Sequence, residues 1–287
     1  HYMQRLTALV HNALNVPVVS YISDDFYTNK QFKFSPIFWL NHMFIRRRTR
    51  KIFRHYSLVY TMTDEQKQQC EHDFCANMKI LRKNGKFENQ YLKSKVNDPI
   101  RFVYAGGIYL NRWKTLGTLA EAMRHINADG VKMVLDIYTN NKLDQQMQQE
   151  INDGITARVH KAVSMAELMD IYHKSDVALH AEAFDITNRH VVRMSFSTKI
   201  VDCMDSGCAV MAICDKKQAG GSYLRRNECA ICIHDLKQIE SVLRNIVDHP
   251  NQLIKMQNKA FEVGRKNHLQ ENITRDLIND FESLCKK

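Results

Sequence analysis

The segment SFSTKIVDCMDSGCAVMAIC, residues 195–214, contains a complete helix, its end and a strand. Hydroxyl side chains open the segment, apolar positions then recur at helical spacing, and Gly207 ends the helix, because glycine readily adopts the left-handed conformation found after helices. The uninterrupted apolar run that follows is typical of a strand buried on both faces of a parallel sheet. The segment therefore predicts one helix–strand unit of an α/β fold.

The same alternation extends over nearly the whole chain, and we predict a strand at 16–22, 57–62, 78–83, 100–106, 131–139, 157–163, 177–182, 208–214 and 229–235. Segments with helical periodicity separate these runs, which predicts parallel sheets in doubly wound α/β domains. Two of the helix starts show a capping-box pattern, Thr63 with Gln66 and Ser164 with Glu167.

One polar segment, at 84–99, interrupts the alternation and is interpreted as an interdomain linker. We therefore predict a partial Rossmann-like lobe over 1–84, a linker over 85–97, a second lobe over 98–265, and a C-terminal helix over 266–287 that packs back on the first lobe. Because the chain opens in the middle of a helical pattern, HYMQRLTALVHNAL, we expect the first lobe to be incomplete.

The charge balance favours an anionic partner. Lysine and arginine number 41 against 31 acidic residues, a formal net charge of +10, which suits nucleotides, phosphorylated substrates, nucleic acid or an anionic membrane. The basic residues do not alternate with aromatic ones as they do on RNA-binding sheets, so we expect no nucleic acid partner.

The eight cysteines are scattered, and CAIC at 229–232 is the only Cys-x-x-Cys pair. A structural zinc site needs a second pair or matching histidines, so we interpret these thiols as small buried side chains of a strand and expect no structural zinc. No apolar run is long enough to span a bilayer, and no signal peptide is visible. We therefore expect a cytoplasmic protein with reduced thiols.

Candidate functional residues follow the predicted strands, where open α/β sheets bind ligands. They are Asp24 and Asp25 after the first strand, Gly106 and Gly107 with Arg112 and Lys114 after the fourth, and Glu182 and Asp185 after the strand at 177–182. The glycine pair alone could be a simple turn. The two carboxylates could equally be a helix cap and a solvated acid.

The helix start at Ser197, Thr198 and Lys199 has two interpretations. Ser197 could cap the helix through its hydroxyl, or the free N–H groups and the helix dipole could bind an anion. Lys199 opposes the dipole, which makes sense if a phosphate neutralises both. Asp202, on the same helix, would then lie beside the anion, and a carboxylate is a natural partner for the paired hydroxyls of a ribose.

The order of these elements resembles the donor-binding lobe of the retaining GT-B glycosyltransferases of family 4. The motifs that carry the resemblance are YAGGIYLNRWKTLGTLAEAM, MAELMDIYHKSDVALHAEAFD and FSTKIVDCMDSGCAVMAIC. The resemblance covers about 98–240 and extends more loosely over 16–97. It implies a GT-B fold, with two Rossmann-like lobes that face a cleft.

The resemblance also implies roles for the candidate residues. Lys114 and Lys199 would clamp the diphosphate of a UDP- or GDP-linked sugar, helped by Ser197 and Thr198, without a metal and without a cofactor other than this co-substrate. Asp202 would bind the ribose, the backbone around His160 the base, and Asp185 the sugar, with Glu182 as its rival. The acceptor would lie on the side of Asp24 and Asp25.

The sequence departs from the family pattern at two places. Gly107 stands where an arginine often follows the first glycine, so either Arg112 substitutes for that arginine or Lys114 acts with Lys199 alone. The two acids are Asp185 and Asp202, and the spacing between them is longer than usual because of the inserted ITNRHVVRMSF.

A basic stretch at 42–56 contains Arg46, Arg47, Arg48, Arg50, Lys51 and Arg54, and Ile45, Ile52, Phe53 and Tyr56 can share one helix face. A basic amphipathic helix favours contact with an anionic membrane, here the inner membrane surface. The alternative is a solvated helix whose apolar face belongs to the core.

These observations predict a retaining glycosyltransferase that moves a sugar to a glycan or lipid-linked acceptor in cell-surface polysaccharide synthesis. Two alternatives remain open: a GT-B nucleotide-sugar epimerase, and a non-catalytic α/β protein that binds a nucleotide or another anion.

Overall fold

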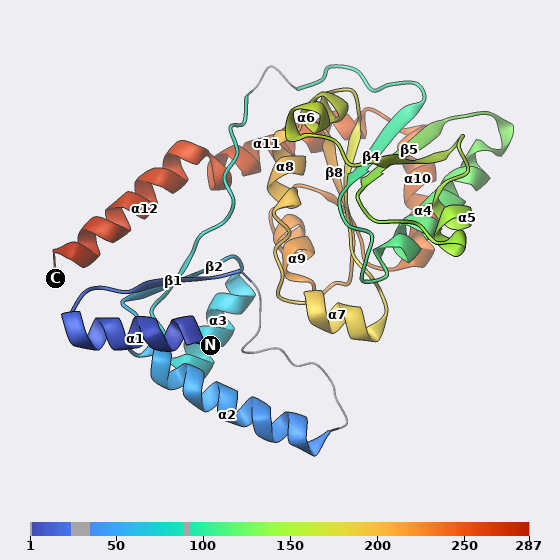
Figure 1. Cartoon of the computed structure of the whole chain (residues 1–287). Coiled ribbons are helices and arrows are strands. Elements are labelled where there is room, and N and C mark those ends of the chain that lie inside the picture. Colours follow the sequence, from blue (N-terminus) through green and yellow to red (C-terminus); the bar gives the residue numbers. More distant parts are fainter. Residues whose placement is uncertain (1, 24–34, 89–91, 287) are drawn as a thin grey trace.

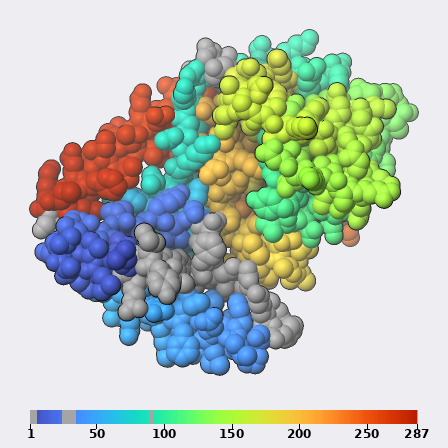
Figure 2. All heavy atoms as spheres, in the orientation of Figure 1, coloured from blue at the N-terminus to red at the C-terminus, as the bar shows by residue number. Residues whose placement is uncertain are grey.

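The computed structural model describes residues 2–23, 35–88 and 92–286, which form two parallel sheets (Figure 1). The first sheet has three strands in the order β1-β2-β3, and the second has six in the order β6-β5-β4-β7-β8-β9. Figure 2 shows the N-terminal residues in blue and the middle of the chain in green as separate masses. The predicted α/β class with parallel sheets is confirmed.

The first sheet is built around β2, which is buried at every position. Its elements are α1 (Tyr2–Leu14), β1 (Val19–Ile22), α2 (Pro36–Phe53), β2 (Leu58–Thr61), α3 (Asp64–Phe74) and β3 (Met78–Ile80). Thr63 caps α3 by accepting a hydrogen bond of 3.0 Å from the backbone N–H of Gln66. The predicted capping box is incomplete, because the Gln66 side chain accepts a bond from Thr61 instead.

The second sheet contains the other strands, β4 (Ile100–Ala105), β5 (Met133–Thr139), β6 (Ala157–Lys161), β7 (Val177–Ala181), β8 (Ala209–Ile213) and β9 (Ile231–Ile233). All nine predicted strands are therefore present, most of them shorter than their apolar runs. The chain proceeds outward from β4 to β6, returns to β7 beside β4, and then proceeds to β9. The strand order thus reverses between β4 and β7, and open α/β sheets bind ligands at such a point.

Helices cover both faces of the second sheet (Figure 1). They are α4 (Arg112–Ile126), α5 (Gln145–Ile151), α6 (Met165–His173), α7 (Ile186–Val192), α8 (Lys199–Asp205), α9 (Ala219–Arg226), α10 (Ile239–Asp248) and α11 (Gln252–His268), with short 3-10 turns η2 (Asn127–Asp129) and η3 (Leu236–Gln238). The predicted capping box at α6 is present, since Ser164 and Glu167 bond reciprocally. One core cluster includes residues of α4 and α10 and the other residues of α8, α9 and α11, so the sheet is buried on both sides.

Helix α12 (Gln270–Cys285) extends from the second sheet to the first (Figure 1). Its Asp280 accepts a hydrogen bond of 2.8 Å from the Tyr60 hydroxyl on β2 and pairs with Lys79 on β3. At the other end of α12, Gly85 forms a parallel bridge with Leu269. The segment that leads into the second sheet and the segment that leaves it therefore pair with each other.

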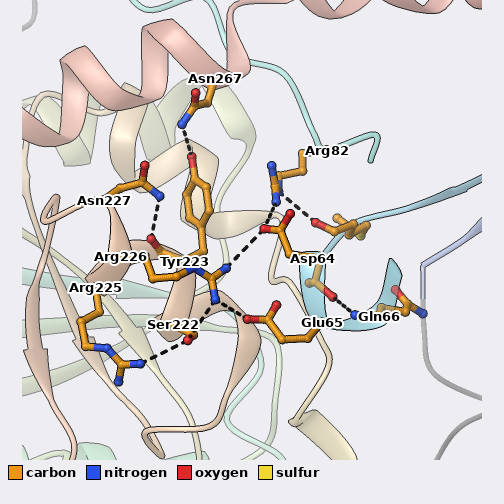
Figure 3. Close-up of polar contacts among 12 residues, drawn as sticks. Asp64, Glu65, Gln66, Arg82, Ser222, Tyr223, Arg225, Arg226, Asn227 and Asn267 are labelled. Carbon is orange, nitrogen blue, oxygen red and sulfur yellow. Dashed lines mark hydrogen bonds and ion pairs between the residues drawn. The ribbon is translucent and has the colours of Figure 1, made fainter. Parts of the chain in front are cut away.

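Polar side chains also join α3 to α9 (Figure 3). Arg226 on α9 forms ion pairs with Asp64 and Glu65 in the first turn of α3. The guanidinium of Arg82, which follows β3, bonds to Asp64 and lies 4.8 Å from the centre of the Tyr223 ring. These contacts fix the first sheet against the second.

Most of the basic stretch belongs to α2, and the apolar residues at its end match the alternative in which the apolar face is part of the core. Ile52, Phe53 and Tyr56 are buried in the core of the first sheet, so they cannot face a membrane. The exposed apolar side chains lie earlier in the helix, at Ile37, Trp39, Leu40, Met43 and Phe44. No helix of the described part of the chain is long and apolar enough to cross a bilayer.

Candidate functional site

Two adjoining cavities open at the carboxyl ends of β4, β5 and β7. The larger cavity, about 520 Å³, is lined by the Gly106–Gly107 turn, the end of β5, α6 and Asp202. The smaller cavity, about 320 Å³, is lined by Arg112, Glu182 and the loop 195–199. Tyr109, Thr198 and Lys199 line both. A ligand with two parts could therefore fill both cavities and pass Lys199 at their junction.

The glycine turn after β4 is shaped to receive the Lys199 side chain. Gly106 has a φ of 146°, and a β-carbon there would lie only 1.5 Å from Nζ of Lys199. The turn itself is held by a 2.7 Å bond from the Tyr104 hydroxyl to the carbonyl of Gly107. Only glycine permits both this backbone conformation and the close approach of the lysine.

The charge of Lys199 is poorly compensated. Burial, followed by repulsion from the Arg112 charge, lowers the pKa of Lys199. Within the described residues, no hydrogen-bond acceptor contacts its Nζ, which instead lies 5.1 Å from the centre of the Tyr104 ring. A half-buried ammonium group in this condition is stabilised by an incoming anion.

Arg112 and Glu182 form a bidentate ion pair in the smaller cavity. Nε and Nη2 of Arg112 lie 2.7 and 3.1 Å from the carboxylate oxygens of Glu182, which is only 3% exposed. Thr115 donates a further bond to the Glu182 carbonyl. Arg112 is therefore already occupied by Glu182, which limits its capacity to replace the missing family arginine as a phosphate ligand.

Asp185, by contrast, is the N-cap of α7. It accepts a 3.0 Å bond from the backbone N–H of Asn188 and a 3.1 Å bond from the Asn111 side chain. Desolvation alone would raise the pKa of Asp185, but its hydrogen bonds with Asn188 and Asn111 outweigh it and lower the pKa. Asp185 lines neither cavity, so the structure brings Glu182 rather than Asp185 to the site.

Two further predicted residues lie away from the cavities. Lys114 is on the exposed side of α4, with Nζ 5.4 Å from the centre of the Trp113 ring. His160 bonds to Asp136 at 2.7 Å and stacks on the Tyr138 ring, which itself lines the larger cavity. Asp24 and Asp25 lie outside the described residues.

The helix start at α8 differs from the expected cap. The helix begins at Lys199, its N-cap is Thr198, and Thr198 makes no side-chain capping bond. Of the two interpretations of this helix start, capping by the Ser197 hydroxyl is wrong, because Ser197 contributes only its carbonyl, which accepts a 3.0 Å bond from the N–H of Ile200. Since α8 has only seven residues, its dipole is small, and the Lys199 charge is the larger attraction for an anion.

Sequence reasoning missed several residues that line the cavities. Tyr138 lies near the carboxyl end of β5 and Asn141 follows the strand by two residues, so the rule that ligands bind at strand ends could have identified both. Asn141 also accepts a 2.8 Å bond from the Ile108 N–H and so braces the glycine turn. Lys83, which pairs with Asp202 in the larger cavity, gave no signal in the sequence.

No metal site is evident in the described ranges, which contain no group of three or more His, Cys, Asp or Glu placed to hold an ion.

The sequence matches no family model and no curated protein. The structure is similar to solved glycosyltransferase structures. Sucrose-phosphate synthase from Thermosynechococcus elongatus superposes with a TM-score of 0.68 at 14% identity, over 99% of this chain and 71% of that one. WaaG, a glycosyltransferase of lipopolysaccharide biosynthesis, gives 0.63 at 13% identity, over 96% and 80%.

Anabaena HepE in complex with UDP and glucose gives a TM-score of 0.64 at 13% identity, over 98% of this chain and 75% of that chain. The predicted GT-B fold is therefore confirmed, and so is the resemblance in fold to family 4 glycosyltransferases.

Proposed function

We propose that the protein is a retaining glycosyltransferase that transfers a sugar from a nucleotide-sugar donor to a glycan or lipid-linked acceptor. The observation that carries the proposal is the pair of adjoining cavities at the β4–β7 reversal, which meet at the poorly compensated Lys199. A nucleotide sugar has the same three parts in the same order: a nucleoside, an anionic diphosphate and a sugar.

The larger cavity suits the nucleoside. Tyr138, Met165 and Leu168 offer apolar surface to a base, and Asp202 offers a carboxylate to the ribose hydroxyls. The diphosphate would then lie over the glycine turn, beside Lys199 and the Thr198 hydroxyl. A purely apolar ligand would not fit this arrangement, because it would leave the ammonium of Lys199 buried without a counter-ion.

The smaller cavity suits the sugar. Its polar groups include Glu182, Arg112 and the hydroxyls of Ser195 and Ser197, which can bond to the hydroxyls of a hexose. When the bond between the sugar carbon and the phosphate oxygen breaks, negative charge accumulates on the leaving diphosphate. A fixed ammonium in a site of low dielectric stabilises that charge more than it stabilises the bound donor, so Lys199 can accelerate transfer without a metal ion.

The comparisons guide the choice of donor and pathway. The HepE structure contains UDP and glucose, so UDP-sugars are the first donors to test and GDP-sugars the next. WaaG acts in lipopolysaccharide biosynthesis, which supports a role in cell-surface polysaccharide synthesis. At these low identities, the donor and the acceptor of this chain both belong to the proposal.

The exposed end of α2 supports contact with an anionic membrane surface, which we propose to be the inner one. Ile37, Leu40 and Phe44 are 79%, 55% and 67% exposed at one end of the helix. Arg47 and Arg50 follow within the same helix, and both line open surface hollows. Exposed apolar side chains beside arginines suit the boundary between acyl chains and anionic headgroups, where a lipid-linked acceptor would be found.

The test has two stages. A thermal-shift screen of UDP, GDP and their sugars identifies the donor, because a ligand of the native state raises the melting temperature. Release of nucleoside diphosphate from that donor is then measured with and without candidate acceptors, and the anomeric configuration of the product is read by NMR. Binding without turnover would favour a non-catalytic nucleotide-binding protein, and conversion of the sugar without diphosphate release would favour an epimerase.

A further inference from the structure

Lys83 joins the two parts of the molecule at the larger cavity. It follows β3 of the first sheet, and its ammonium group forms a close ion pair with Oδ1 of Asp202 on α8 of the second. Both side chains line the cavity, and both are partly shielded, at 32% and 19% exposure. The pair is therefore less screened by solvent than an ion pair on an open surface.

Contacts of Lys83 and of its neighbour Arg82 hold this part of the chain in place. Its carbonyl accepts a 3.2 Å bond from Nδ1 of His268 at the end of α11. The preceding residue, Arg82, bonds to the carbonyl of Met62 at 2.9 Å and packs its guanidinium over Tyr223 (Figure 3). The ammonium group can therefore reach Asp202 only while the first and second sheets keep this arrangement.

We propose that Lys83 is a positioning residue that orients the Asp202 carboxylate for a ribose. This inference rests on the proposed function, because it takes Asp202 as the ribose ligand. A carboxylate has two oxygen atoms that each accept hydrogen bonds. Lys83 holds Oδ1, which fixes the carboxylate plane and leaves Oδ2 to accept bonds from the ribose hydroxyls.

The consequence is a coupling between nucleotide affinity and the contact of the two sheets. Asp202 is well oriented only when Lys83 is in place, so the arrangement with both sheets in contact binds the ribose more tightly. By thermodynamic reciprocity, a bound nucleotide must then stabilise that arrangement to the same extent. The glycine turn and Lys199, which are not bonded to Lys83, would still bind the diphosphate.

The experiment compares two ligands on matched variants. Calorimetry measures the Kd of whichever of UDP and GDP the wild type binds more tightly, and of its 2′,3′-dideoxy analogue. Lys83→Met should weaken the ribonucleotide by about tenfold, the size expected for impaired hydrogen bonds to a charged group, and should leave the analogue nearly unchanged. Lys83→Arg should restore much of the difference, and Lys86→Met is a control at an exposed lysine outside the larger cavity.

A second background separates orientation from direct contact. In Asp202→Asn protein, Lys83→Met should cause little further loss, because the group that it orients is no longer a carboxylate. Equal loss for the ribonucleotide and the dideoxy analogue would make Lys83 a phosphate ligand and would overturn the proposal, as would unchanged affinity for both. A wild type that binds no nucleotide would overturn the proposed function itself, which distinguishes that failure from failure at Lys83.

Discussion

Replacing Lys199 by methionine separates the two possible roles of its positive charge. Methionine keeps much of the side-chain volume beside Gly106 and Tyr104 and removes the ammonium group. In the ligand-free protein this group has no acceptor among the described residues, so the substitution breaks no observed hydrogen bond. We therefore expect Lys199→Met to fold normally, with an unchanged or higher melting temperature.

The pH dependence of stability gives a second readout. Because burial lowers the pKa of Lys199 below its ordinary value of 10.5, the unfolded chain holds this proton more tightly than the native protein does. Stability contributed by this residue therefore rises as pH increases through the window just below 10.5. The Lys199→Met variant should lack that rise, so any excess of its free energy of unfolding over that of the wild type should be largest near neutral pH.

The magnitude on the ligand side is much larger. A lost charge-assisted hydrogen bond costs roughly 1.5–3 kcal/mol, or about 10- to 150-fold in affinity for a nucleoside diphosphate. Turnover of the donor should fall at least as much, because the charge on the leaving diphosphate grows in the transition state.

The assay is calorimetry with UDP or GDP and a coupled assay for diphosphate release. Lys114→Met is the matched control, since Lys114 lies on the exposed side of α4 and lines neither cavity. Wild-type affinity and turnover in Lys199→Met would refute the reasoning. Loss in Lys114→Met with no loss in Lys199→Met would move the diphosphate to the other lysine.

Three further predictions test the site and its surroundings. Glu182→Gln should lower stability by about 3–5 kcal/mol, because it leaves Arg112 without its buried partner. Asp185→Asn should cost about 1 kcal/mol or less, the size of a helix cap. A denaturant titration in which Asp185→Asn is the more destabilising variant would contradict this ranking. Burial, followed by the Arg82 charge, lowers the pKa of His268 to about 4. As pH drops from about 6.5 to 4, the unfolded state therefore takes up the proton before the native state does, and the free energy of unfolding should fall by at most roughly 3 kcal/mol. His268→Gln should flatten that slope even if it lowers stability overall. Arg47→Gln with Arg50→Gln should reduce binding to vesicles that contain anionic lipid, and added salt should reduce wild-type binding; equal binding to neutral vesicles would favour a solvated helix.

The local pattern of the sequence was sufficient for the fold. Each of the nine strands coincides with an apolar run, and the capping of α3 and α6 begins at the predicted Thr63 and Ser164. These features depend on residues a few positions apart, so periodicity and cap chemistry specify them without knowledge of the rest of the chain. For the same reason, the sequence placed the glycine turn at the end of a strand and Lys199 at the start of a helix, and the structure brings the two together.

Tertiary structure decided which side chains meet there. Glu182 and Asp185 both follow β7 and look equivalent in sequence, yet one pairs with Arg112 in the cavity and the other caps α7. Lys83 and Asp202 are 119 positions apart and touch only because the two sheets pack together. The packing of whole helices and strands decides where a side chain at the end of a strand points and which distant residue it meets. The energy of that packing is spread over many contacts, so it leaves no local pattern in the sequence.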